Sequence, residues 1–354
     1  MKNFLKTLVF LLLCAGIFLG LNYVYGIPYE NGTHMQETVK TYNGLYNEPE
    51  NTWDGVILGT SITDRAWVAP TAWNEYGMTI YPLATDSQPI NLSTDILDEV
   101  RKRQDIKLVV LELHGILGMN AGEIRVRRVT DNMQSTIARI KTVNHALAFA
   151  EENFGEESKL KDVDVLSLYF PFIKYHSRTD LRKDDFTHPG NETKGAVVAK
   201  KLAFRSKPQK TPTLSTACGT LTETQTAFLD EFMEYADENG LEILFLSIPS
   251  GHKTAQQEVV NAALDYVAKK GYSTLNMNTE EVYEEIQLDF STDLYNKKHL
   301  NSLGAQKTTK YLSRFIHENF DLTDKRGQEA YQSWDDAYET YMNIFNTEWA
   351  KKSK

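Results

Sequence analysis

Short apolar runs that alternate with helical patterns constrain the fold of this chain more than any other feature. The runs occupy residues 55–59, 78–83, 107–113, 241–248 and, more weakly, 272–276. Continuous apolar runs of this length are typical of strands buried on both faces of a parallel sheet. Apolar residues at helical spacing separate the runs, at 89–104, 222–240 and 253–270. The alternation predicts an α/β fold in which helices cover both faces of a parallel sheet.

The stretch 120–212 interrupts this alternation between the third and fourth predicted strands. A helical pattern at 132–154 lies within it, and a run of aromatic and polar residues follows. We therefore predict an α-rich insertion here. Ligand sites of open α/β sheets lie at the carboxyl ends of the strands. An insertion that follows a strand directly is expected near such a site.

The N-terminus has the pattern of a membrane anchor. Lys2 and Lys6 precede a nearly uninterrupted apolar stretch from Thr7 to Gly20. Positive charges before the apolar stretch predict that the N-terminus stays inside and the rest of the chain lies outside. A cleaved signal peptide is the alternative, but no small-x-small cleavage motif precedes Ile27. We expect residues 1–26 to be an uncleaved single-pass anchor in the cell membrane, with an extracytoplasmic body.

The remaining segments follow from composition and periodicity. Residues 27–51 are polar and are expected to form a stalk or a leading segment packed on the domain, which we place at 52–321. The tail, 322–354, is predicted to be a C-terminal amphipathic helix. Its aromatic residues share one helical face, which is expected either to dock on the domain or to meet a partner or bilayer surface. They are Trp334, Tyr338, Tyr341, Phe345 and Trp349.

Charge and cysteine content exclude several classes of partner and site. The formal net charge is -10, so no basic surplus exists to neutralise a nucleic acid backbone. Cys14 and Cys218 are far apart in the chain, so a disulfide between them is not expected. His188 with Asp184 and Asp185 matches no known ligand spacing. We expect no metal site and no organic cofactor.

Two segments carry residues with the pattern of nucleophilic catalysis. Gly59-Thr60-Ser61 follows the first predicted strand, where a turn would expose the serine hydroxyl at the edge of the sheet. Backbone N–H groups at the start of the next helix would face a developing oxyanion. Taken alone, such a triplet after a strand is more often an ordinary helix N-cap. Near the end of the domain, Asp293, His299 and Asn301 stand close together before a predicted helix.

Together these two segments resemble the first and last motif blocks of the SGNH/GDSL hydrolases. The resemblance covers roughly Trp53 to Phe320, apart from the insertion. It is closest to membrane-anchored members, including the D-alanine transfer proteins of lipoteichoic acid and polysaccharide O-acetylation proteins. The single anchor and the phrase His299-Leu-Asn301-x-x-Gly304-Ala305 suggest this subgroup. The resemblance implies a three-layer, flavodoxin-like α/β domain.

The resemblance also implies an activity. Ser61 would be the nucleophile and His299 the general base of an esterase or acyltransferase. Its substrate would be an acyl group, with acetyl the first candidate, on a cell-surface glycan or related polymer. A membrane acyltransferase is the expected partner if acyl transfer is the reaction. A non-catalytic accessory protein that binds such a polymer is the alternative function.

Two departures from the family pattern concern the groups around the serine and the histidine. The family carries an acid three residues before the histidine, but Asn296 stands there and Asp293 is the nearest acid. Asp293 is therefore expected to orient His299, with Asn296 or a backbone carbonyl as alternatives. The family's oxyanion asparagine has no match after the third strand. The family's second-block glycine has no clear match either, and Ser87 or Gln88, in the segment at its place, is expected to donate to the oxyanion.

Other polar residues have weaker patterns. His176 and Arg178, in the insertion, could bind a polyhydroxy or anionic substrate, or belong to a surface loop. Glu112 and His114 end the third predicted strand, where sites form. A buried structural pair is the simpler expectation for these two residues.

Overall fold

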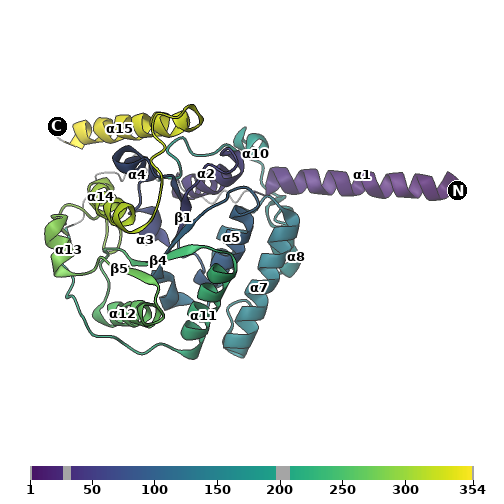
Figure 1. Ribbon diagram of the computed structural model, residues 1–354. Coiled ribbons are helices and arrows are strands. Elements are labelled where there is room, and N and C mark those ends of the chain that lie inside the picture. Colours follow the sequence, from purple (N-terminus) through teal and green to yellow (C-terminus); the bar gives the residue numbers. More distant parts are fainter. Residues whose placement is uncertain (1, 27–32, 197–207, 353–354) are drawn as a thin grey trace.

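Five parallel strands form the centre of the domain (Figure 1). The structure is a computed structural model that describes residues 2–26, 33–196 and 208–352. The sheet has the order β2-β1-β3-β4-β5, as in doubly wound flavodoxin-like sheets. The strands are β1 (Gly55–Gly59), β2 (Ile80–Ala84), β3 (Leu108–Glu112), β4 (Glu242–Ser247) and β5 (Ser273–Asn276). The predicted parallel α/β sheet is confirmed.

Helices lie on both faces of this sheet, which explains why its strands read as continuous apolar runs. α4 (Ala69–Tyr76) and α14 (Ser302–Asn319) pack together on one side. On the other side lie α5 (Ser93–Val100), α11 (Glu223–Glu238) and α12 (Thr254–Lys269) (Figure 1). Every residue of β1, β2 and β3 is buried. Such strands need apolar side chains in both directions.

Short helices complete the connections. The α-helical ones are α3 (Ser61–Asp64) and α13 (Glu280–Glu285). The 3-10 turns are η1 (Ile90–Leu92), η2 (Leu113–Gly118), η3 (Gly155–Glu157) and η4 (Glu329–Tyr331). The helix predicted at 89–104 is therefore a 3-10 turn followed by a shorter α-helix that ends at Val100.

Between β3 and β4 the chain forms a group of helices on one flank of the domain (Figure 1). They are α6 (Glu123–Thr130), α7 (Thr136–Phe154), α8 (Val165–Tyr169), α9 (Phe172–Tyr175) and α10 (Asp184–Thr187). Residues 197–207 of the predicted insertion lie outside the described residues. We use "insertion" below for residues 120–196.

The N-terminal helix α1 (Lys2–Tyr25) projects away from the domain (Figure 1). It is long and apolar enough to cross a membrane, and most of its side chains are exposed. Helix α2 (Thr33–Asn47) follows, and its Tyr42 and Leu45 are buried in the core. This part of the predicted stalk therefore packs against the domain, whereas residues 27–32 lie outside the described residues.

The C-terminal helix α15 (Gln332–Lys352) docks on α4. Trp334 and Tyr341 on its aromatic face are each only 1% exposed. The Trp73 indole N–H donates to Asp335 at 2.8 Å. Just before α15, Lys325 forms an ion pair with the buried Asp54 at 2.8 Å. The aromatic stripe predicted from the sequence thus serves mainly to fix the tail to the domain.

Candidate active site

Ser61 is the first residue of α3, directly after the carboxyl end of β1. Thr60 caps this helix, and its side chain accepts a hydrogen bond from the Ile62 N–H. β1 can lie directly against α3 because its last residue, Gly59, has no side chain. A Cβ at Gly59 would lie 2.0 Å from Oγ1 of Thr63. The first N–H groups of a helix have no acceptor within it, so the Ser61 N–H has no intrahelical partner.

His299 lies in a closed loop between β5 and α14. Asp293 and Asn301 form the base of this loop, since the Asn301 N–H donates to the Asp293 carbonyl at 2.8 Å. The Asn301 side chain then caps α14 by accepting from the N–H groups of Leu303 and Gly304. The loop is thus fixed at both ends, and it presents His299 to the serine.

The hydroxyl of Ser61 and the imidazole of His299 are in hydrogen-bond contact. The Ser61 Oγ to His299 Nε2 distance is 2.8 Å, although the two residues are far apart in the sequence. Nε2 must accept the serine proton if His299 is to act as a base. The ring proton of the neutral imidazole then resides on Nδ1.

Asn296 occupies the Nδ1 side of the ring. Its Oδ1 lies 3.1 Å from Nδ1 of His299, and its Nδ2 lies 2.9 Å away. Because Nδ1 carries the proton in the base-competent tautomer, Oδ1 is the partner that accepts it. The same oxygen accepts from the backbone N–H groups of Lys298 and His299, at 2.8 and 3.0 Å. These bonds fix the amide in place, so that it can orient the imidazole.

Asp293 has a different place from the one expected. Its buried carboxylate contacts Lys307 at 2.8 Å, the Thr292 hydroxyl at 2.9 Å and the Asp289 N–H at 2.9 Å. No contact with the imidazole of His299 is found among the described residues. The expectation that Asp293 orients His299 is therefore not supported. It stabilises the loop, while Asn296 contacts the ring.

The surroundings of His299 favour its neutral form. Burial, followed by the nearby Arg65 guanidinium, lowers the pKa of His299 to about 4. Arg65 is itself paired with Asp64 at 2.9 Å and lies over the Tyr295 ring. A neutral imidazole at pH 7 can accept a proton, as a general base must.

A pocket of about 320 Å³ opens at Ser61 and His299. It lies at the carboxyl edge of the sheet, where sites of α/β proteins form. Its lining includes Thr60, Ile62, Asp86, Ser87, Gln88, His114, Gly115, Leu117, Gly118, Arg125, Gln256 and Lys298. The positive side chains of Arg125 and Lys298 face the single carboxylate of Asp86, which pairs with Arg128. The charged side chains of the lining are therefore mainly positive.

Ser87 and Gln88 both line this pocket, on the turn after β2, and the Gln88 amide is engaged in contacts of its own. Both ends of the Gln88 amide are already bonded: Oε1 accepts from the Tyr42 hydroxyl at 2.9 Å, and Nε2 donates to the Leu83 carbonyl at 3.1 Å. Gln88 thus ties α2 to the end of β2. Ser87 has a left-handed backbone, with φ at 57°, an uncommon conformation for a residue other than glycine.

His114 and His252 are part of the site that sequence reasoning missed. His114 was expected to form a buried structural pair with Glu112, yet its ring lines the Ser61 pocket. The His252 ring lies beside it, with centroids 4.7 Å apart. Burial, followed by the neighbouring His252 and Lys298, lowers the pKa of His114 to about 3, and burial, followed by Lys298, lowers that of His252 to about 4. His114 and His252 each closely follow a predicted strand, and this position was the signal in the sequence that could have placed them near a site.

Glu112 is buried as expected, beneath the pocket. Its Oε1 accepts from the His114 N–H at 3.0 Å, and burial raises its pKa to about 8. A second serine and histidine pair lies nearby, with Ser250 Oγ 2.7 Å from His252 Nε2. Ser250 is fully buried and does not line the pocket. Of the two serines, only Ser61 has access to a ligand.

His176 and Arg178 do not lie in the Ser61 pocket. The His176 Nδ1 contacts the Ile173 carbonyl at 2.9 Å, and Arg178 pairs with Asp185 next to α1. Their expected role in substrate binding at this pocket is not supported by these positions. Within the described ranges, no group of three or more His, Cys, Asp or Glu residues is arranged to hold a metal ion.

Comparison with known proteins gives no further assignment. No protein-family model matches the sequence, and no curated protein shows significant similarity to it.

Proposed function

We propose that this protein is a serine esterase or O-acyltransferase of the SGNH type, held at the cell membrane by α1 with its domain outside. Its substrate in this proposal is an acyl ester, with acetyl the first candidate, of a cell-surface glycan or related polymer. The observation that supports it best is the 2.8 Å contact between Ser61 Oγ and His299 Nε2 in an open pocket. The likeness to the SGNH motif blocks supports the same reading.

In the proposed reaction Ser61 Oγ attacks the acyl carbon while His299 Nε2 takes the hydroxyl proton. The tetrahedral intermediate collapses when the C–O bond to the leaving alcohol breaks, and the alcohol receives that proton from Nε2. An acyl-enzyme on Ser61 remains. Water, or a second sugar hydroxyl, then attacks it with His299 again as base. Asn296 holds the imidazole in the tautomer that these proton transfers need.

The oxyanion of the intermediate requires hydrogen-bond donors in the pocket. We assign this role to the backbone N–H of Ser61, to the Ser87 turn and to the ring N–H of His114. Two observations support His114: its side chain lines the pocket together with Ser61 and His299, and its low pKa keeps the ring neutral. In this proposal, His114 replaces the asparagine of the family.

A fluorophosphonate probe tests the proposal directly. The full-length protein in detergent is expected to gain one adduct, located by mass spectrometry on Ser61 and absent from Ser61→Ala. Ser250 is an internal control, because it has the same bond to a histidine but is fully buried. Turnover of p-nitrophenyl acetate should disappear in Ser61→Ala and persist in Ser250→Ala.

A non-catalytic polymer-binding protein is the second candidate. One observation favours it, because the amide of Asn296 cannot stabilise the imidazolium as a carboxylate would. Folded protein that forms no adduct, shows no serine-dependent turnover and still binds a polymer would overturn the enzyme proposal in favour of this one.

A further inference from the structure

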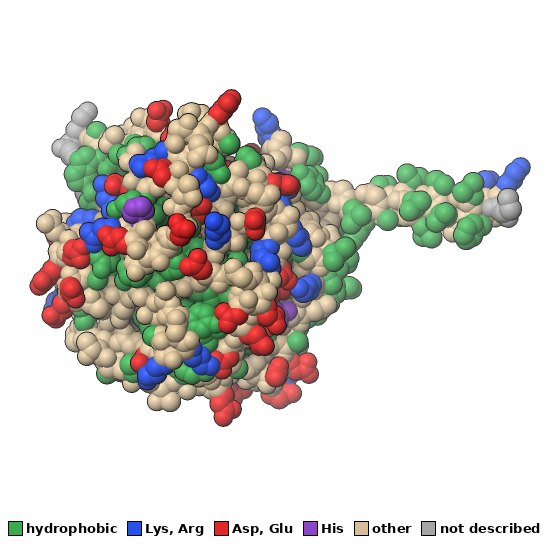
Figure 2. All heavy atoms as spheres, in the orientation of Figure 1, with side chains coloured by type: hydrophobic (Ala, Val, Ile, Leu, Met, Phe, Trp, Pro, Cys, Tyr) green, Lys and Arg blue, Asp and Glu red, His purple; other side chains and the backbone are tan. Residues whose placement is uncertain are grey.

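Exposed apolar side chains gather on the insertion. Among the described residues outside α1, the large hydrophobic residues that are exposed are Ile124, Ile137, Leu166, Leu181, Phe186 and, on α15, Trp349. All except Trp349 lie on or beside the helices α6 to α10. We call these five insertion residues the collar. Figure 2 shows hydrophobic side chains beside the base of the protruding helix.

Helix α1 leaves the domain among these elements and is fixed to them. The Phe18 ring contacts the rings of Phe170 and Phe172, with centroids 5.0 and 6.0 Å apart. The Asn22 Oδ1 accepts from the Phe172 N–H at 3.1 Å, and Tyr23 stacks on His188 at 4.1 Å. The last two turns of α1 are thus part of the insertion's surface.

Members of the collar lie close to this junction. Phe186 is on α10, which contacts α1 directly. Leu166 is on α8, which packs on α9, and α9 also contacts α1. Ile137, which is 83% exposed, follows Thr136, a residue that shares a pocket with Leu19 and Asn22 of α1. Three of the five collar residues therefore lie on elements close to the point where α1 leaves the domain.

The length of α1 determines how deep this junction lies in a bilayer. A hydrocarbon core about 30 Å thick takes about 20 helical residues at about 1.5 Å each. A span that begins at Lys2 therefore ends near Asn22, and one that begins at Lys6 ends near Gly26. In both cases Phe18 lies about 6 Å or more inside the outer boundary. Tilting the helix would place Phe18 deeper still. α1 cannot cross the bilayer without drawing the aromatic end of α9 to the lipid surface.

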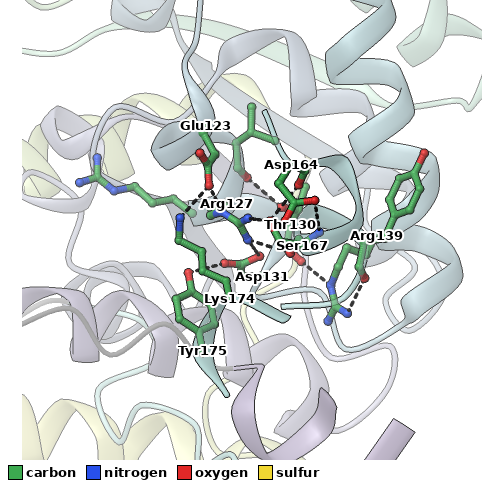
Figure 3. A network of polar contacts seen from close by, with 12 residues as sticks. Glu123, Arg127, Thr130, Asp131, Arg139, Asp164, Ser167, Lys174 and Tyr175 are labelled. Carbon is green, nitrogen blue, oxygen red and sulfur yellow. Dashed lines mark hydrogen bonds and ion pairs between the residues drawn. The ribbon is translucent and has the colours of Figure 1, made fainter. Parts of the chain in front are cut away.

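A polar network holds the collar helices rigidly from within (Figure 3). Arg127 of α6 pairs with Glu123 at 2.7 Å and with Asp131 at 3.5 Å, and it donates to the Ser167 carbonyl of α8 at 3.0 Å. Lys174 of α9 reaches the same Glu123 at 2.7 Å. These bonds link α6, α8 and α9 below their exposed faces. Ile124 and Leu166 are therefore carried by helices that a partly buried polar network holds together.

We infer that the collar is a membrane-docking surface, which inserts into the outer lipid interface around α1 and fixes the orientation of the domain on the bilayer. This inference rests on the anchor in the proposed function. It also concerns the substrate, because α6 carries both Ile124 of the collar and Arg125 of the pocket. Docking holds the Ser61 pocket close to the lipid surface. The enzyme would therefore act on acyl groups carried next to the membrane.

Depth measurement with single cysteines tests this docking. The full-length chain is reconstituted in liposomes of phosphatidylcholine and phosphatidylglycerol, and one cysteine is labelled with an environment-sensitive fluorophore. Leu166→Cys, Phe186→Cys and Ile137→Cys are made in a Cys14→Ser, Cys218→Ser background. Trp349→Cys is the matched control, since Trp349 is 42% exposed on a different helix. Lipids that carry a nitroxide near the headgroup quench fluorophores that lie in the membrane, and iodide quenches fluorophores that lie in water.

The collar labels are expected to be quenched several-fold more by the lipid nitroxide, and several-fold less by iodide, than the label at residue 349. Native Cys14, retained in a Cys218→Ser chain, reports on the anchor alone. If Cys14 is quenched from the lipid while the collar labels behave like that at residue 349, the docking inference is wrong and the anchor stands. None of these readings depends on Ser61, so they are separate from the test of serine chemistry. Thermal unfolding of each variant confirms that it is folded.

Discussion

Replacing Asn296 by aspartate exchanges the amide NH2 for a carboxylate oxygen at the position where this site departs from the SGNH pattern. The Asn296 Oδ1 lies 3.1 Å from Nδ1 of His299, and a carboxylate can keep the same bonds to the backbone of Lys298. The substitution therefore adds a negative charge beside the imidazole without removing an acceptor. An opposite charge within about 4–6 Å shifts a pKa by roughly 1–3 units. Starting from about 4, the pKa of His299 should rise to roughly 5–7.

The sign of the effect on activity follows from the role of the base. In the proposed mechanism His299 works in its neutral form, so activity is expected to fall as the pH drops through its pKa. At pH 5, a histidine with a pKa of about 4 is about 90% neutral, whereas one with the ordinary value of about 6.5 is only about 3% neutral. Wild-type protein should therefore keep its activity at pH 5, and the Asn296→Asp variant should lose part of it.

The assay is the pH dependence of kcat/KM for p-nitrophenyl acetate, from about pH 4 to pH 8. Asn296→Ala is the control, since it removes the acceptor without adding charge. Its rate should fall on the order of 10²-fold because the ring is no longer oriented. Its acidic limb should not follow that of Asn296→Asp. Identical acidic limbs in the wild type and Asn296→Asp would refute the assignment of His299 as the titrating base beside Asn296.

Other substitutions separate the remaining roles. Asp293→Asn should lower the thermal midpoint, because it weakens the contact with Lys307 by about 1–3 kcal/mol, and the folded variant should keep its kcat. A large loss of kcat at unchanged stability would instead mean that Asp293 orients His299. His114→Ala should lower kcat by about 10²–10³-fold with KM little changed, as removal of an oxyanion donor does, and a change confined to KM would contradict that role. Trp334→Ala should destabilise the domain by about 3–5 kcal/mol in urea unfolding, and a loss below about 1 kcal/mol would mean that α15 adds little to the fold.

The sheet could be predicted closely because burial on both faces leaves a direct signal. The run at 55–59 coincides with β1, and the run at 241–248 contains β4 with one residue added at each end. The helix expected at 222–240 is α11, which a capping box of Thr222 and Gln225 opens. The helix at 89–104 was less well defined, because apolar spacing alone does not distinguish a 3-10 turn from the first turn of an α-helix.

The choice between Asp293 and Asn296 could not be made from spacing. It depends on how the loop closes, and the bridge between Leu294 and Leu300 turns the Asp293 carboxylate towards Lys307. The pairing of His114 with His252 depends on β3 and β4 being neighbours in the sheet. Strand order is set by tertiary packing, so this pair was not visible in the sequence.

The docking of α15 also has a consequence for the synthesis of this protein. Asp54 and Trp73 lie near the start of the domain, whereas their partners Lys325 and Asp335 follow the whole sheet in the sequence. Until those later residues are present, the Asp54 carboxylate has Thr79 as a donor but lacks its ion pair, and the Trp73 indole lacks the cover of Trp334. Exposed apolar surface of this kind makes a partly folded chain prone to aggregate. The domain can therefore reach its final packing only once residues 325–335 are present, and a chaperone would protect the chain until then.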